Sequence, residues 1–139
     1  MNWPTYFNGI PILLGDWVRV YVPRLGVWHH GIITALFRVR NGMAVQIVHN
    51  DKSNGVSLID WYDFADGNDI FLHKRPKQEH AQAVVARACA NVGRSYHLFA
   101  QNCEHFASFA FTGEARSESI RAVVAIAAVV LIIGLFGAD

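Results

Sequence analysis

The chain has 139 residues, a formal net charge of +1 and a hydrophobic content of 53%. That length provides one domain with a modest core, and the near-neutral charge without a basic stripe argues against a nucleic-acid partner. Two cysteines are too few for a disulfide framework in a chain of this size, which favours a reducing compartment.

Residues 1–14 predict an irregular arm that packs its aromatic side chains on the domain. Pro4, Gly9 and Pro11 interrupt this stretch, so it lacks the continuous apolar segment of a secretory signal. We therefore expect no cleaved signal peptide.

A series of β-rich segments follows and predicts an antiparallel meander. Gly15 and Asp16 open the first of them, and Asn41-Gly42 is the strongest short hairpin signal in the chain. The predicted strands are residues 15–23, 29–40, 43–48, with His49 at its end, and 56–59.

The next segments predict a change from strands to helices. Residues 60–69 are expected to form a loop or short helical turn, and residues 70–73 an edge strand. Apolar residues then recur at helical spacing over residues 78–92, which predicts an amphipathic helix with Gly93 as its C-cap. Cys89 lies on the predicted apolar face, so we expect it to be inert packing.

The second cysteine, Cys103, stands where another helical pattern begins. Tyr96, Leu98 and Phe99 predict a short extended piece before it, and Asn102 is a good N-cap residue. In the first helical turn, unpaired N–H groups and the helix dipole favour a thiolate, the reactive form of cysteine. A buried and inert Cys103 remains the alternative.

The C-terminal segment is strongly apolar. Residues 122–138 contain no charged residue, and as a helix this stretch reaches roughly 25 Å, near the lower limit for a bilayer span. We expect a membrane anchor, with a packed or oligomerising helix as the alternative. Arg116 and Arg121 precede the apolar run and favour placing the preceding domain on the cytoplasmic side.

Two blocks of sequence resemble a known family. Asn-Cys-Glu-His-Phe at residues 102–106, with Gly-x-x-Tyr-x-Leu at 93–98 and Gly-x-Ala-Arg-Ser at 113–117, resembles the cysteine block of the lecithin:retinol acyltransferase-like family. Gly-Asp at 15–16 followed by His-x-Gly-Ile at 29–32 resembles its second block. That family includes the phospholipase A/acyltransferases and belongs to the NlpC-type, permuted papain-like superfamily.

The expected fold class is α+β, with helices packed on a small antiparallel sheet. The resemblance implies the permuted papain-like form of this class. It divides the chain into the arm at 1–14, a catalytic domain at 15–116 and a C-terminal hydrophobic helix at 117–139.

The resemblance also implies the catalytic residues. It places the nucleophile at Cys103 and the general base at His29 rather than at its neighbour His30, whose side chain points to the opposite face of an extended strand. The third residue falls on His49, although its spacing from His29 is longer than usual in the family, which predicts a longer hairpin. The alternative for His49 is a hydrogen-bonded histidine at a strand end. His105 is expected, with Glu104, to support the helix.

The implied reaction is acyl transfer through a Cys103 thioester, on glycerophospholipid or other acyl esters, with no cofactor and no metal. Water would resolve the thioester in a phospholipase A type hydrolysis, and an amine or alcohol would resolve it in acyl transfer. Two alternatives remain: an NlpC-type cysteine peptidase or amidase, and a non-catalytic membrane-bound interaction module.

Overall fold

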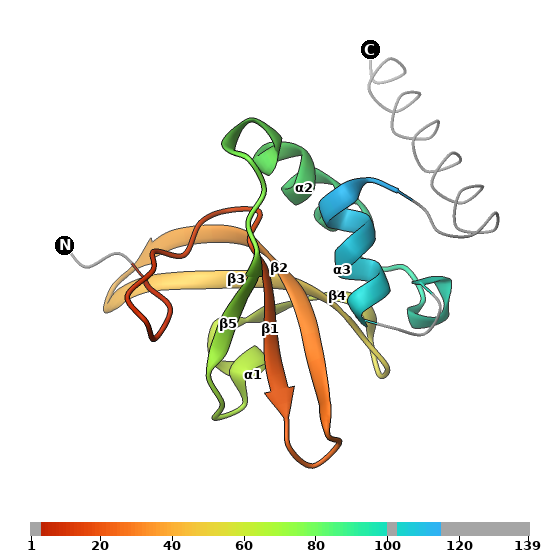
Figure 1. The fold of residues 1–139 in the computed structure, drawn as a ribbon, viewed down its shortest axis with the longest axis horizontal. Coiled ribbons are helices and arrows are strands. Elements are labelled where there is room, and N and C mark those ends of the chain that lie inside the picture. The colour runs from red at the N-terminus through yellow and green to blue at the C-terminus, as the bar shows by residue number, and fades with distance from the viewer. Residues whose placement is uncertain (1–3, 100–102, 115–139) are drawn as a thin grey trace.

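The structure is a computed structural model that describes residues 4–99 and 103–114 (Figure 1). The predicted C-terminal helix at 117–139 and the predicted N-cap Asn102 lie outside these residues. Over the described residues the fold is α+β, as predicted. No helix within them is both long enough and apolar enough to cross a membrane.

One five-stranded sheet, in the order β4-β3-β2-β1-β5, forms the centre of the domain. All neighbouring strands are antiparallel. The predicted meander is β1 to β4, and the predicted edge strand, β5, crosses to the far edge beside β1. The strands are β1 (Trp17–Val22), β2 (Val27–Val39), β3 (Gly42–Asp51), β4 (Gly55–Asp60) and β5 (Ile70–Lys74).

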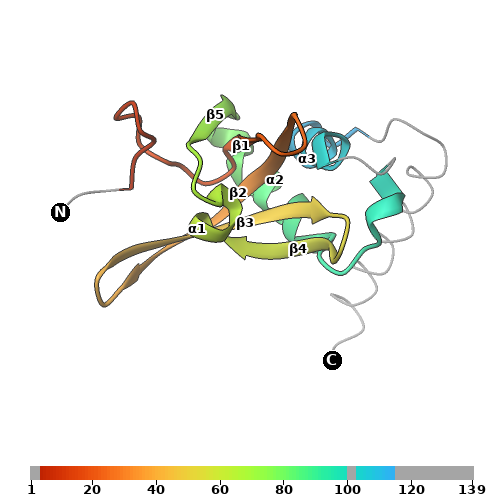
Figure 2. The same ribbon diagram turned by 90° about the horizontal axis from the view of Figure 1, so that it is seen from below.

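The helical elements lie on different sides of this sheet (Figures 1 and 2). Two longer helices, α2 (Gln78–Ala90) and α3 (Cys103–Thr112), pack on one face with Trp17, Ile32 and Val48. On the other face, Phe64 of the short helix α1 (Trp61–Ala65) packs with Tyr6 and Ile12 of the N-terminal arm. The sheet is therefore buried on both faces over its central part.

The β2–β3 hairpin is long and closes with two residues. Val39 pairs with Gly42, so the turn consists of Arg40 and Asn41 and lies one residue before the predicted Asn41-Gly42 turn. At the other end of the same ladder, Gly31 pairs with His49. The long strands therefore accommodate the wide spacing between His29 and His49, as predicted.

The Gly15-Asp16 pair anchors the N-terminal arm to the sheet. Gly15 has φ +86°, and a Cβ there would lie 3.2 Å from the backbone of Ala81, so the close approach of α2 requires glycine. The fully buried Asp16 carboxylate accepts two 2.8 Å hydrogen bonds from Arg75 and others from Tyr6 Oη at 3.1 Å and the Leu13 N–H at 3.0 Å. This network joins the arm, β1 and the segment after β5.

Helix α2 ends earlier than predicted. Its C-cap is Asn91 rather than Gly93, because the Asn91 side chain donates to the carbonyl of Arg87 at 2.7 Å and satisfies the last turn. Gly93, at φ +94°, instead donates its N–H to the carbonyl of Val56.

Two other local predictions are wrong. Cys89 is exposed rather than packed, since Val84 and Ala88 form the buried stripe of α2 and Cys89 lies beside it. The predicted extended piece before Cys103 is a 3₁₀-helix, η1 (Tyr96–Phe99), whose Tyr96 carbonyl accepts a hydrogen bond from Asn50 at 3.1 Å. The alternation of apolar residues there is too short to distinguish a strand from a tight helical turn.

Candidate active site

Cys103 occupies the first position of α3, and its sulfur lies against the backbone of β2. The thiol donates to the carbonyl of Trp28 at 3.8 Å. Within the part of the chain that the structure describes, the thiol has no hydrogen bond to the imidazole of His29. The structure therefore places the sulfur beside the strand that carries His29 and His30, in contact with its main chain.

The electrostatic environment of Cys103 combines two opposing effects. Burial raises the pKa of its thiol, while the backbone N–H groups of His30, Glu104 and Cys103 itself act to lower it. Burial is the larger effect, so the expectation that the helix start alone would favour the thiolate is wrong for this resting arrangement. The N–H groups that face the sulfur nevertheless form a site for negative charge.

His29 and His49 meet across the β2–β3 hairpin. His29 Nε2 lies 2.8 Å from His49 Nδ1, although the two residues are 20 apart in the chain. Burial lowers the pKa of both rings, that of His49 to about 4. Both rings are therefore neutral at physiological pH, and one donates its proton to the other.

Gly31 leaves the space in which the Phe64 ring packs beside this histidine pair. A Cβ on Gly31 would lie 2.6 Å from Ile47 Cγ2 and 3.0 Å from Phe64 Cε2, closer than atoms pack. The Phe64 ring lies 5.3 Å from the His29 ring and 6.1 Å from the His49 ring. The glycine of the His-x-Gly-Ile pattern thus allows Phe64 of α1 to pack against both histidine rings and restrict their orientation.

His30 turns to the other face of β2. Its Nδ1 accepts a 2.8 Å hydrogen bond from Trp17 Nε1, and its ring lies 5.4 Å from that of His73. Burial lowers the pKa of His30 to about 4. A neutral His30 whose Nδ1 is an acceptor carries its proton on Nε2, so it is held as an N–H donor.

A cavity of about 490 Å³ adjoins Cys103 on the α3 side of the sheet. His30 lines it and His29 does not. The other lining residues come from five elements, β1, β2, β5, η1 and α3: Arg19, Val27, Trp28, His73, Tyr96 and Glu104. The cavity therefore brings the candidate nucleophile together with cationic, aromatic and acidic side chains.

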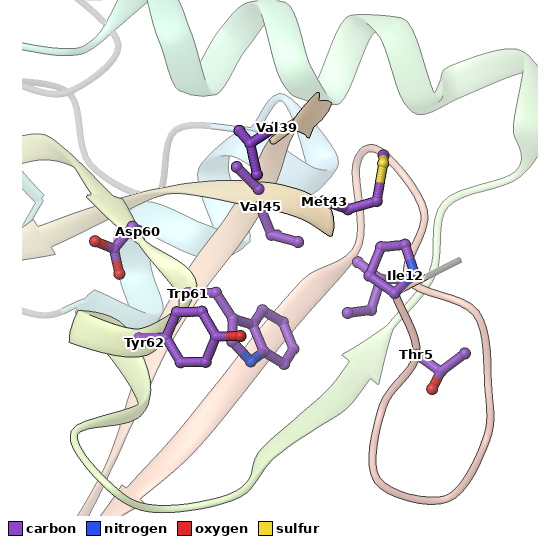
Figure 3. Close-up of a pocket in the computed structure, with 10 residues that line it drawn as sticks. Thr5, Ile12, Val39, Met43, Val45, Asp60, Trp61 and Tyr62 are labelled. Atoms are coloured by element: carbon purple, nitrogen blue, oxygen red, sulfur yellow. The ribbon is translucent and has the colours of Figure 1, made fainter. Parts of the chain in front are cut away.

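Another cavity, of about 400 Å³, lies on the opposite side of the sheet (Figure 3). Its wall is largely apolar and includes Ile12, Val39, Met43 and Trp61. It contains none of the three predicted catalytic residues, so we do not assign the chemistry to it.

Sequence reasoning missed several residues of the Cys103 cavity. It gave no catalytic role to His73 or Arg19, and it expected Glu104 to support the helix. Residues 19 and 30 are cross-strand partners, and Arg19 also pairs with Phe71 of β5. The register of β1 with β2 and β5 therefore gathers these side chains, and that pairing is a long-range property without a local signal.

Comparison with models of protein families finds a match. A family model described as Lecithin retinol acyltransferase matches residues 12–116, which is most of the chain. Comparison with curated protein sequences finds no match. Members of the matched family are typically acyltransferases or phospholipases, which indicates an enzyme of this general kind acting on lipid acyl esters. The chain therefore belongs to the lecithin retinol acyltransferase family.

Proposed function

We propose that the chain is a membrane-tethered thiol acyltransferase or phospholipase A that acts on glycerophospholipid esters. Cys103 is the nucleophile, His29 the general base and His49 the residue that orients the base. The observation that carries this assignment is the 2.8 Å contact between His29 Nε2 and His49 Nδ1. It gives a histidine base the partner that such a base needs to hold one tautomer.

One tautomer of this histidine pair would allow His29 to act as the base. If His29 donates its Nε2 proton to His49, its Nδ1 has a free lone pair. The Cys103 thiol contacts the Trp28 carbonyl in this structure, so its transfer of a proton to His29 requires the two side chains to come within hydrogen-bond reach when substrate binds. His49 remains neutral because burial lowers its pKa to about 4, so it can accept the hydrogen bond from His29. When His29 becomes an imidazolium, His49 stabilises it through the same contact.

His30 is the other candidate base because it lines the Cys103 cavity. Its Nδ1 already accepts the hydrogen bond from Trp17, and Nε2 carries the proton of the neutral ring. Neither nitrogen offers a free lone pair. We therefore assign His30 the role of a donor in the cavity and the role of base to its neighbour His29.

The reaction proceeds in two steps. The Cys103 proton passes to His29 Nδ1 as the sulfur attacks the ester carbonyl carbon, and backbone N–H groups at the start of α3 stabilise the oxyanion. The C–O bond then breaks, and His29 returns the proton to the leaving alcohol. Water attacks the resulting thioester to release a fatty acid, or an amine or alcohol takes the acyl group.

Turnover of labelled phosphatidylcholine tests this function. We expect the wild-type chain to release labelled fatty acid or transfer it to an added amine, and Cys103→Ala to do neither. Cys89→Ala, which removes the exposed thiol of α2, is the matched control and should retain activity. Hydrolysis of a peptide amide without lipid turnover would instead support the NlpC-type peptidase, and no turnover of either substrate by the folded chain would support the interaction module.

We also propose that residues 122–138 anchor the catalytic domain on the cytoplasmic side of a membrane, and that the fold is the permuted papain-like form. The uncharged composition of this stretch and the preceding Arg116 and Arg121 support the anchor. Truncation after Glu118 tests it. A folded, soluble truncation with reduced activity on vesicles would support the anchor, whereas an aggregating one would favour a helix packed on the domain.

A further inference from the structure

A row of aromatic rings extends away from the Cys103 cavity across one face of the sheet. The Tyr21 ring lies 5.3 Å from that of Trp28, the Trp28 ring 5.8 Å from that of Phe71, and the Phe71 ring 5.0 Å from that of Phe7. These four residues form what we call the aromatic platform. Phe7, Tyr21 and Trp28 are exposed, and the Arg19 guanidinium lies 4.2 Å above the Trp28 ring.

The register of the sheet explains why the platform is open. Tyr21 pairs with Trp28, and Arg19 pairs with Phe71, so these side chains share a face with Trp17 of the same strand. Helix α3 covers this face at Trp17, where its Phe111 ring packs 5.6 Å from the indole. The platform is the continuation of that face beyond the helix, and no described element packs over it.

The β1–β2 hairpin extends the platform at its tip. The hairpin projects beyond the rest of the sheet (Figure 1). Leu25 in its turn is 65% exposed, and Val27 is exposed as well. The turn also carries the exposed Arg24, and no acidic residue occurs between positions 17 and 50. The tip therefore combines apolar side chains with positive charge.

The platform is continuous with the cavity that contains the candidate nucleophile. Trp28 belongs to both, and Arg19, which lies over the Trp28 ring, also lines the cavity. The carbonyl of Trp28 accepts the hydrogen bond of the Cys103 thiol. We propose that the aromatic platform and the tip of the β1–β2 hairpin dock on a phospholipid bilayer surface, so that an ester enters the Cys103 cavity directly from the membrane. This rests on the proposed function, because it names the surface through which the same site takes its substrate.

The chemistry of the platform favours a lipid surface. Indole and phenol rings have an apolar body and a polar tip, and they are enriched at the level of lipid headgroups. Arginine beside such rings attracts anionic headgroups, and an apolar turn residue can enter the acyl region. A second copy of the chain would meet the same positive charge on its own platform, which disfavours self-association through this face.

Leu25→Asp tests the proposal with Leu58→Asp as its control, both in the full chain. Leu25 is in the hairpin turn, away from the catalytic residues, whereas Leu58 is 50% exposed on the edge strand β4, outside the platform. We expect Leu25→Asp to lower turnover of phosphatidylcholine vesicles about tenfold and to leave turnover of a short-chain soluble ester unchanged. Leu58→Asp should change neither. Equal loss on both substrates, or no loss on vesicles, would overturn the proposal.

A binding measurement separates this proposal from the proposed function. Vesicles containing phosphatidylcholine brominated near the ester quench the fluorescence of indole rings that lie close to the headgroups. We expect quenching of the wild-type chain and less quenching of Trp28→Phe and Leu25→Asp, whether or not the chain turns lipid over. Equal quenching of all three would show that the platform stays off the membrane. A wild-type dimer that Leu25→Asp dissociates would assign the surface to a second copy.

Discussion

His29 and His30 are adjacent in β2 and direct their imidazole rings to opposite faces of the sheet, where each meets a different partner. His29 Nε2 contacts His49 Nδ1, and His30 Nδ1 accepts from Trp17 Nε1, both at 2.8 Å. A neutral His29 that donates its Nε2 proton to His49 keeps a free lone pair on Nδ1, whereas a neutral His30 that accepts from Trp17 has none. Of these two adjacent histidines, His29 can therefore accept a proton as a base, whereas His30 can act only as a hydrogen-bond donor.

The first prediction concerns the base. His29→Ala should lower turnover of phosphatidylcholine by about 10²- to 10⁴-fold, the usual contribution of a general base. His49→Gln should cost less, because a glutamine can still accept a hydrogen bond from His29. Steady-state rates of the purified variants, with thermal unfolding as a check on folding, provide the measurement. If His30→Ala were inactive and His29→Ala fully active, the base would be His30.

The second prediction concerns the reactivity of the thiol. Because burial raises the pKa of Cys103, its alkylation by iodoacetamide should accelerate with pH up to values above the ordinary cysteine pKa of about 8.5. The experiment uses the Cys89→Ala variant, so that Cys103 is the only thiol in the chain. A rate that is already maximal below neutral pH would show a preformed thiolate and contradict the account.

The third prediction is the pH dependence of stability. Burial lowers the pKa of His30 and of His49 to about 4, whereas an unfolded histidine titrates near 6.5. Between these values the unfolded chain binds more protons than the folded chain. The free energy of unfolding should therefore fall as the pH is lowered from about 6.5 toward 4, and be fully present above about 6.5.

Urea unfolding at a series of pH values measures this dependence. His49→Gln removes one of the histidines whose pKa is lowered, so it should reduce the slope between pH 6.5 and 4 while retaining a hydrogen-bonding side chain. A stability that rises on acidification over this range would contradict the assignment of neutral, buried imidazoles.

The fourth prediction concerns the Gly15-Asp16 anchor. Asp16→Asn removes the negative charge of the carboxylate that accepts two hydrogen bonds from Arg75. It also replaces one accepting oxygen with an NH₂ group, which cannot accept a hydrogen bond from the donors that surround it. We expect the free energy of unfolding to fall by roughly 2 kcal/mol, since hydrogen bonds to charged groups contribute about 1.5–3 kcal/mol each. Arg75→Gln should destabilise as well, because it leaves the buried carboxylate without its cation. Unchanged urea midpoints in both variants would refute the anchor.

Most strands and helices of this fold could be predicted because the residues that favour them lie within the element itself or in the adjoining turn. Segments rich in β-forming residues indicated β1 to β4, and the Asn41-Gly42 signal indicated the hairpin to within one residue. The position of β5 beside β1 and the shape of η1 had no such signal. The end of α2 was misplaced because the side chain of Asn91 supplied the cap that was expected from Gly93.

The candidate site was predictable only in part, because some of its contacts depend on the pairing of strands that are distant in sequence. The family pattern selected Cys103, His29 and His49, and two of these three lie in contact. The Trp17–His30 hydrogen bond and the lining of the cavity depend on register between β1, β2 and β5. Cys103 also shows that position at a helix start does not determine thiol acidity, because burial outweighs the N–H groups around its sulfur.

The central claim is a covalent acyl-enzyme on Cys103, and mass spectrometry tests it most directly. The chain is incubated with phosphatidylcholine of known acyl composition, quenched in acid to preserve thioesters, and measured intact and after proteolysis. The account predicts a mass increase of one acyl group on the peptide that contains Cys103, removable by hydroxylamine and absent from Cys103→Ala. An acyl group on Cys89 instead, or fatty-acid release by Cys103→Ala at the wild-type rate, would contradict it.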